Sequence, residues 1–277
     1  MIDLHLHTTA SDGRSTPEEL AREVAAAGVT VMAVTDHDTM AAVPAVRAAA
    51  RALGVRVVPG VEITAVHGER DVHVLGYFLD AHHPALVTFL ERQRVDRLRR
   101  LREMAARLVA IGVPVDESAF VADPAAPGKA FGRPMLAAAL MAAGHVASIR
   151  EAFDVYIGEG RPAYIERRGA TPAEVVAIIA AAGGLASLAH PGKLGLDDMI
   201  PGLVEAGLPA IEVFHTDHDA DDVRRYLDFV ERYQLLRTGG SDYHGPGSGR
   251  TTGLGRMHLP SADFDRLVAR AGWQDDA

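Results

Sequence analysis

Short runs of β-branched and apolar residues alternate along the chain with longer stretches of Ala and Leu at helical spacing. This alternation is typical of repeated βα units around a parallel sheet. Two helices have recognisable starts, because Thr16 and Thr171 are each followed by a proline and then by the glutamate of a capping box. We predict strands at residues 2–6, 29–34, 55–58, 72–78, 185–189, 210–214 and 236–239.

Residues 83–160 interrupt this alternation. They contain a long arginine-rich helical pattern, a Pro/Gly/Ala-rich loop at residues 123–129 and further helical sequence. We therefore expect an α/β barrel made of residues 1–82 and 161–277, with residues 83–160 as a helical insertion that caps the substrate site. The seven glycines between residues 239 and 255 predict a mobile loop.

Composition narrows the possible functions. The 277 residues contain no long apolar run and no basic, apolar start typical of a signal peptide, so we expect a soluble, cytoplasmic protein that does not bind membranes. The chain has no cysteine, so any metal must be bound by His, Asp, Glu or water. The net charge of -9 argues against an extended nucleic-acid surface and favours a small anionic partner.

Candidate metal ligands follow nearly every predicted strand. His5 and His7 lie two residues apart on the first strand, so both imidazoles project from one face. In a barrel the strand ends converge, and a cluster this large exceeds the three or four ligands of one zinc ion. We predict two or three metal ions with Glu62 as a bridging ligand. The candidates are His5, His7, Asp36, His37, Glu62, His73, His190, His215, Asp242 and His244.

The remaining histidines have no such position. They are predicted to be scattered surface residues, namely His67, His82, His83, His145, His218 and His258.

Six short motifs occur in order along the chain. They are HLHT at residues 5–8, SDG at 11–13, TDHD at 35–38, PGVE at 59–62, AHP at 189–191 and SDYH at 241–244. Together they resemble the PHP (polymerase and histidinol phosphatase) superfamily, and most closely its branch of nucleoside 3′,5′-bisphosphate phosphatases and short-RNA 5′-3′ exonucleases. The resemblance implies a distorted (β/α)7 TIM-like barrel with a helical insertion.

The resemblance also implies three metal sites, occupied by manganese or alternatively by iron or zinc. Some members have a histidine where this chain has Asp12, and an oxygen ligand there is expected either to weaken metal binding at the third site or to change its metal preference. The implied ligands are His5, His7, Glu62 and Asp242 for the first ion, Glu62, His73 and His190 for the second, and Asp12, His37 and His244 for the third.

Two further residues are catalytic candidates. His215 matches a family histidine near the metals, with ligand support, phosphate contact and proton donation as possible roles. Asp36 is the second candidate. It and Asp38 flank His37 and serve either to orient it or to cap the next helix.

The insertion carries seven arginines between Glu91 and Arg107. They form either a solvated helix face or, for Arg97, Arg99 and Arg100, a clamp over the metal face for a second, non-reacting phosphate. The segment Gly132-Arg133-Pro134 resembles the substrate-contacting segment of the family insertion, and Lys129 lies nearby. Met135 stands where family members often have a histidine.

These features predict a phosphatase that uses metal-activated water to remove the 3′-phosphate of a nucleoside 3′,5′-bisphosphate, with short 5′-phosphorylated RNA as a further substrate. A histidinol-phosphate phosphatase or another small phosphomonoesterase is an alternative, but a histidinol-phosphate phosphatase needs a pocket for an amine. A polymerase proofreading domain would need a polymerase, and an amidohydrolase would not have both Glu62 and the Asp242-x-His244 pair. A non-catalytic nucleotide-binding module is the alternative from another class.

Overall fold

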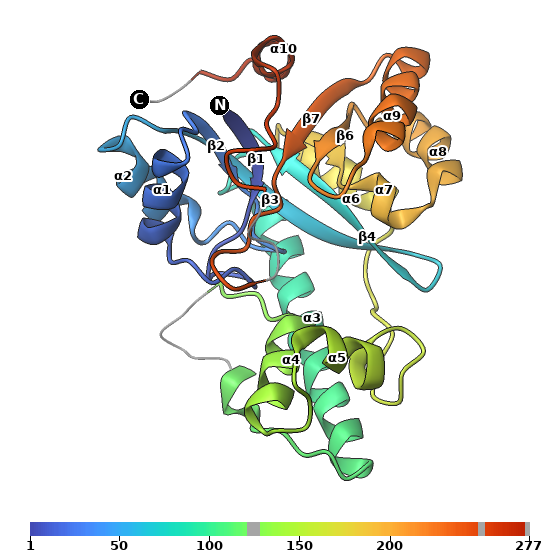
Figure 1. Cartoon of the computed structure of the whole chain (residues 1–277). Helices are drawn as coiled ribbons and strands as arrows, with labels where there is room; N and C mark the ends of the chain where they lie inside the picture. Colours follow the sequence, from blue (N-terminus) through green and yellow to red (C-terminus); the bar gives the residue numbers. More distant parts are fainter. Residues whose placement is uncertain (121–127, 249–252, 275–277) are drawn as a thin grey trace.

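The computed structural model describes residues 1–120, 128–248 and 253–274. Seven strands form one sheet in sequence order, with helices around it and a smaller helical lobe below (Figure 1). The strands are β1 (Ile2–Leu6), β2 (Val31–Val34), β3 (Arg56–His67), β4 (Arg70–Tyr77), β5 (Leu185–Leu188), β6 (Ala210–His215) and β7 (Leu236–Gly240). The helices beside them are α1 (Pro17–Ala26), α2 (Val43–Arg51), α6 (Pro172–Ala181), α7 (Pro191–Leu194), α8 (Ile200–Glu205), α9 (Ala220–Tyr233) and α10 (Ser261–Ala271).

The sheet is mixed, which corrects the expectation of a parallel one. β4 runs antiparallel to both β3 and β5, whereas the other neighbouring strands pair in parallel. The cause is the connection between β3 and β4, because a turn at Gly68 is far too short for the crossover that parallel strands need. β3 is also longer than predicted and carries Glu62 inside the strand.

The sheet curls until its first and last strands meet. The backbone N–H of His7 donates to the carbonyl of Tyr243 at 3.0 Å, and Leu6 forms a parallel bridge with the same residue. The seven strands therefore make a nearly closed barrel, which confirms the distorted TIM-like fold. Closure brings the ends of β1 and β7, which are far apart in sequence, to the same rim.

Both predicted capping boxes are present. Thr16 and Thr171 each accept a hydrogen bond from the glutamate three residues on, whose carboxylate accepts from the threonine backbone in return. α1, α2 and α6 then bury apolar side chains against the sheet, including Leu20, Val46 and Ile179. This packing holds the strands at fixed positions and keeps their ends in register.

The insertion forms a lobe with its own core. Its longest element is α3 (Pro84–Ala110), which runs from the barrel into the lobe, where α4 (Arg133–Ala142) and α5 (Ile149–Ala152) lie beside it (Figure 1). A 3-10 turn, η1 (Glu117–Phe120), and a π-helical turn, η2 (Phe153–Ile157), complete the described part. The buried side chains of Met104, Leu108 and Leu136 belong to this core and not to that of the barrel. The limits 83–160 stay a prediction.

Two expectations need correction, one about a histidine and one about the glycine-rich segment. His218 was predicted to lie on the surface, but it is buried, and its Nδ1 lies 2.9 Å from the carbonyl of Val213. The predicted mobile segment begins as strand β7 and continues as the buried residues Ser241–His244. Residues 249–252 of that segment lie outside the described residues. No helix in the described ranges is long and apolar enough to span a membrane.

Gly240 is required by close packing, since a Cβ there would lie 2.4 Å from both the Cβ and the backbone nitrogen of His5. We expect Gly240→Ala to lower the free energy of unfolding by about 1–3 kcal/mol through overpacking. Urea unfolding in the presence of a chelator measures this effect on the fold alone. Gly202→Ala in α8 is the control, because nothing lies within 4 Å of its added methyl group. Equal midpoints for the two variants would contradict the prediction.

Candidate active site

The nine residues predicted as metal ligands lie together at one rim of the barrel. His5 and His7 come from β1 and the residue after it, Glu62 from β3 and His73 from β4. Because β4 runs antiparallel, its ligand lies near the start of the strand and still reaches the same rim. The other members follow strands, and they are Asp12, His37, His190, Asp242 and His244. Five groups among the rim residues have ligand atoms within 4.8 Å of one another.

Glu62 lies at the centre of the cluster and is 1% exposed. Its Oε1 is 2.8 Å from His73 Nδ1 and 3.1 Å from His190 Nε2. Its Oε2 is 3.0 Å from His37 Nδ1, and 3.5 and 3.4 Å from the Nε2 atoms of His5 and His7. The two oxygens thus face different sets of imidazoles, which is the arrangement expected of a bridging carboxylate.

A second group surrounds Asp12. One carboxylate oxygen lies 3.2 Å from His244 Nε2, and the other lies 3.7 Å from His37 Nε2. His7 completes the group, with its Nδ1 3.9 Å from Asp12. Asp12, His37 and His244 are the residues predicted to bind the third ion, and His7 is one of those predicted to bind the first.

The donor atoms of this cluster suit divalent ions. Within the described residues, His5 Nε2 and both ring nitrogens of His7 are buried and make no hydrogen bond. Buried polar atoms normally have partners, and ring nitrogens without one at a single rim fit residues that bind a cation. Imidazole and carboxylate together are ligands that manganese, iron and zinc all accept.

Glu212 on β6 is a member of the site that the sequence analysis missed. Its Oε1 lies 3.0 Å from His5 Nδ1, and its Oε2 accepts from the backbone N–H of His190 at 2.7 Å. Burial alone would raise the pKa of Glu212, but the imidazoles of His5 and His215 outweigh it and lower that pKa to about 2. An ionised Glu212 holds the Nδ1 proton of His5 and leaves Nε2 facing the cluster.

His215 lies in the cluster, as predicted. Its Nδ1 accepts a hydrogen bond from the backbone N–H of Asp217 at 3.0 Å. Its Nε2 is therefore the protonated nitrogen, 3.6 Å from Asp242 Oδ2.

Asp36 does not have the position expected of a catalytic group. Its carboxylate accepts from the backbone N–H and the hydroxyl of Thr8, at 2.8 and 2.7 Å, and from the hydroxyl of Ser11 at 2.6 Å. It therefore holds the loop between His7 and Asp12. Asp38 pairs with Arg97 and Arg167, so neither aspartate caps the next helix by its side chain.

Three arginines meet at Asp71, another residue missed in the sequence. Its carboxylate lies 3.3 Å from Arg100, 3.2 Å from Arg133 and 3.5 Å from Arg167. Burial alone would raise the pKa of Asp71, but the three guanidinium groups outweigh it and lower the pKa to about 2. One carboxylate does not neutralise three guanidinium groups, so this group of side chains keeps a net positive charge.

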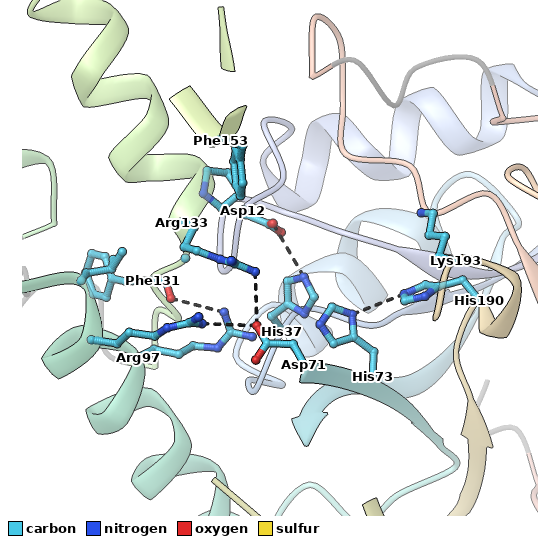
Figure 2. A pocket seen from close by; sticks show the side chains of 14 residues that line it. Asp12, His37, Asp71, His73, Arg97, Phe131, Arg133, Phe153, His190 and Lys193 are labelled. Carbon is cyan, nitrogen blue, oxygen red and sulfur yellow. Dashed lines mark hydrogen bonds and ion pairs between the residues drawn. The ribbon is translucent and has the colours of Figure 1, made fainter. Parts of the chain in front are cut away.

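A cavity of about 300 Å³ lies between an arginine wall, formed by Arg97, Arg100 and Arg133, and the histidine cluster. Figure 2 shows Arg97 and Arg133 on one side, His73 and His190 on the other, and Lys193 beside His190. Lys193 was also missed, and its Nζ lies 3.2 Å from Asp242 Oδ2. The remaining lining is partly apolar and comes from the lobe, at Leu101, Phe131, Pro134 and Phe153.

Two predicted substrate contacts lie elsewhere. Arg99 pairs with Asp96 at 2.6 Å and Glu103 at 2.7 Å on another face of α3, outside the cavity. Lys129 lies with its Nζ 5.9 Å from the ring centre of Phe131 and does not line the cavity. Arg97, Arg100 and Arg133 do line it.

Comparison with known proteins agrees with this geometry. The sequence profile of the PHP domain matches residues 3–112. A 3′,5′-nucleoside bisphosphate phosphatase from Chromobacterium violaceum is 34% identical over 255 residues, which cover 90% of this chain and 88% of the relative. The chain belongs to the PHP family.

Two further relatives of the PHP chain have different activities. A phosphoribosyl 1,2-cyclic phosphate 1,2-diphosphodiesterase from Eggerthella lenta is 37% identical, over 88% of this chain and 94% of the relative. A 5′-3′ exoribonuclease from Salmonella typhimurium is 33% identical, over 89% and 86%. All three relatives hydrolyse phosphate esters, and the PHP chain is accordingly a phosphoester hydrolase.

The fold of the chain is also similar to that of a solved phosphoesterase structure. The structure of a metal-dependent phosphoesterase from Bifidobacterium adolescentis superposes with a TM-score of 0.87 at 30% identity, covering 97% of this PHP chain and 96% of the other.

The role of Glu212 can be tested apart from turnover. We expect Glu212→Gln to lower metal affinity about 10–100-fold, because an amide fixes the His5 ring less firmly than a carboxylate. Manganese titration followed by calorimetry measures the affinity, and circular dichroism checks the fold. Glu205→Gln, at an exposed position in α8, removes the same charge and should bind manganese like the wild type. Equal affinities for all three proteins would show that Glu212 does not position His5.

Proposed function

We propose that this PHP enzyme removes the 3′-phosphate of nucleoside 3′,5′-bisphosphates and also cleaves short 5′-phosphorylated RNA. The observation that carries the proposal is that one cavity has a cluster of metal-ligand type on one side and an arginine wall on the other. Such a cavity suits a molecule with two phosphates, one that reacts and one that is only held. The names of two relatives support the same substrates.

We assign the ligands as the sequence motifs imply. Glu62 would be shared by the first and second ions, and Asp12 would bind the third. The ligand groups found at the rim support this division, since His5, His7 and Asp242 form one, Glu62 is shared by two, and Asp12 lies with His37 and His244 in another. We propose manganese as the ion, with iron and zinc as alternatives to be distinguished by elemental analysis of the purified protein.

The residues of the chain have separate tasks in the reaction. When bound, the ions supply an activated water as nucleophile and neutralise the phosphoryl oxygens. Arg100 and Arg133 hold the non-reacting phosphate, because guanidinium groups match the geometry of phosphate oxygens. Lys193 lies beside Asp242 and donates to an oxygen of the reacting phosphoryl group. His215 holds a proton on Nε2 at the same side and is the candidate acid for the leaving oxygen.

A phosphoribosyl cyclic phosphate is the second candidate substrate, on the strength of the Eggerthella lenta relative. It also carries two phosphate groups, but it has no base. The apolar side chains of Leu101, Phe131 and Phe153 in the cavity favour a substrate with a nucleobase. Phosphate release from a panel of nucleoside bisphosphate, phosphoribosyl 1,2-cyclic phosphate, 5′-phosphorylated dinucleotide and histidinol phosphate decides among these substrates. A panel with no turnover in the presence of manganese, iron or zinc would overturn the proposal.

Metal dependence has a readout that does not need the substrate. We expect manganese to raise the melting temperature of the metal-free protein, since an ion that binds only the folded state stabilises it by mass action. The increase should be smaller in His7→Gln, which lacks a ligand shared by two groups at the rim. Differential scanning calorimetry measures both. An equal increase in the variant would place the ion elsewhere.

The arginine wall should act on binding and not on the chemistry. We expect Arg133→Ala to raise KM for a nucleoside bisphosphate about 10–100-fold, the loss of one charge-assisted contact, while KM for an aryl phosphate changes about twofold or less. Arg99→Ala is the matched control, because it removes the same charge from α3 outside the cavity. Equal effects of Arg133→Ala on both substrates would remove the clamp from the mechanism.

A further inference from the structure

A second cavity of about 320 Å³ adjoins the first and has no role in the mechanism above. The two cavities share Asp12, Pro134 and Phe153 in their walls, so they meet at the metal-ligand cluster. The first cavity touches His73 and His190, whereas the second touches His244. The cluster therefore lies between two spaces, and only the first one contains the arginine wall.

The walls of the second cavity are chemically different from those of the first. They are formed mainly by apolar side chains of the lobe, namely Met135, Ala138, Ile149 and the ring of Phe153. An apolar wall with an aromatic ring suits the flat face of a nucleobase, which gains about 1–3 kcal/mol from stacking on such a ring. A phosphate would lose its hydration there without gaining hydrogen bonds.

A cationic side chain, that of Arg14, is among the described lining residues of the second cavity. Arg14 is exposed, and its backbone N–H donates to the carbonyl of His244 at 2.8 Å, which places it beside the cluster. Among the described residues no carboxylate forms an ion pair with its guanidinium group, whereas Arg97, Arg100 and Arg133 are all paired. A guanidinium group that has no carboxylate partner among the described residues, in the wall of an apolar cavity, suits a phosphate that follows a bound nucleoside.

We propose that the second cavity binds the nucleoside on the 3′ side of the scissile phosphate in a 5′-phosphorylated oligonucleotide. This proposal rests on the proposed function and extends it. The first nucleoside has its 5′-phosphate at the arginine wall and its 3′-phosphate at the cluster, so it spans the first cavity. Only a group attached to the other ester oxygen of the scissile phosphate extends beyond the cluster. The second nucleoside is that group, and Arg14 then faces the next phosphate.

The bond that breaks is the same in both substrates. Water adds to phosphorus and gives up a proton, the bond between phosphorus and the O3′ atom of the first nucleoside breaks, and O3′ leaves with the electron pair and takes a proton. With a bisphosphate the phosphate departs free. With an oligonucleotide it stays on the O5′ atom of the second nucleoside, whose base lies in the second cavity.

Filling the cavity tests the proposal. Ala138 is exposed on α4 and lines only the second cavity, so an indole at this position fills the space without disturbing a core. Three substrates are compared, namely a nucleoside 3′,5′-bisphosphate, the methyl ester of its 3′-phosphate, and a 5′-phosphorylated dinucleotide. The methyl ester is a diester without a second nucleoside. Met141→Trp, on α4 but outside both cavities, is the control variant.

We expect Ala138→Trp to lower kcat/KM for the dinucleotide at least tenfold relative to the methyl ester and the bisphosphate. Met141→Trp should leave all three ratios within about twofold of the wild type. Arg14→Gln should lower kcat/KM about tenfold for a 5′-phosphorylated trinucleotide relative to the dinucleotide, because only the trinucleotide has the following phosphate.

The possible outcomes separate this proposal from the function on which it rests. A wild type that hydrolyses the bisphosphate, with unchanged substrate ratios in Ala138→Trp, overturns the second cavity as a nucleoside site and leaves the phosphatase in place. No wild-type cleavage of the dinucleotide overturns it as well. A wild type that cleaves the dinucleotide and not the bisphosphate, with the expected loss in Ala138→Trp, supports the nucleoside site and overturns the phosphatase.

Discussion

The structure depends on keeping one buried carboxylate, that of Glu62, among imidazoles from distant parts of the chain. An ionised carboxylate is costly in a protein interior unless it is paired. Burial alone would raise the pKa of Glu62, but the imidazoles of His37, His73 and His5 outweigh it and hold that pKa well below its usual range. These residues come from the rims of β1, β2 and β4, so only the curled sheet brings them together. The pairing of Glu62 therefore depends on how the first four strands of the sheet curl.

The backbone around the cluster is adapted to this constraint. His190 and Asp242, which follow β5 and β7, have positive φ angles of 29° and 54°, a region that non-glycine residues rarely adopt. Each such residue costs about 1–3 kcal/mol and turns the chain sharply at the strand end, so that its side chain points into the rim. Gly13 is required for a different reason, the close packing of the loop after β1. A Cβ at this position would lie 2.6 Å from the carbonyl oxygen of His7.

The sequence was most informative where local pattern and site coincide. The i, i+2 spacing of His5 and His7 on one strand predicts their common face directly, and the ligands after the strands follow from barrel geometry. Glu212 was missed because it lies within a strand, where nothing local separates a buried glutamate from an exposed one. Arg99 was misplaced for a different reason. Helical spacing puts Arg97, Arg100 and Leu101 on one face of α3 and Arg99 on another. The structure agrees with this spacing, because the first three residues are buried and Arg99 is not.

Chemistry and specificity are divided between the two parts of the chain. The barrel provides the candidate metal ligands, with Glu62 at their centre, and Glu212 beside them. The lobe provides most of what can distinguish one ester from another, including Arg100, Arg133 and the apolar walls of both cavities. Three relatives at similar identity with three different substrates are consistent with this division. Met135 on α4 lines the second cavity, so another residue at this position changes the space beside the rim without changing a residue of the cluster.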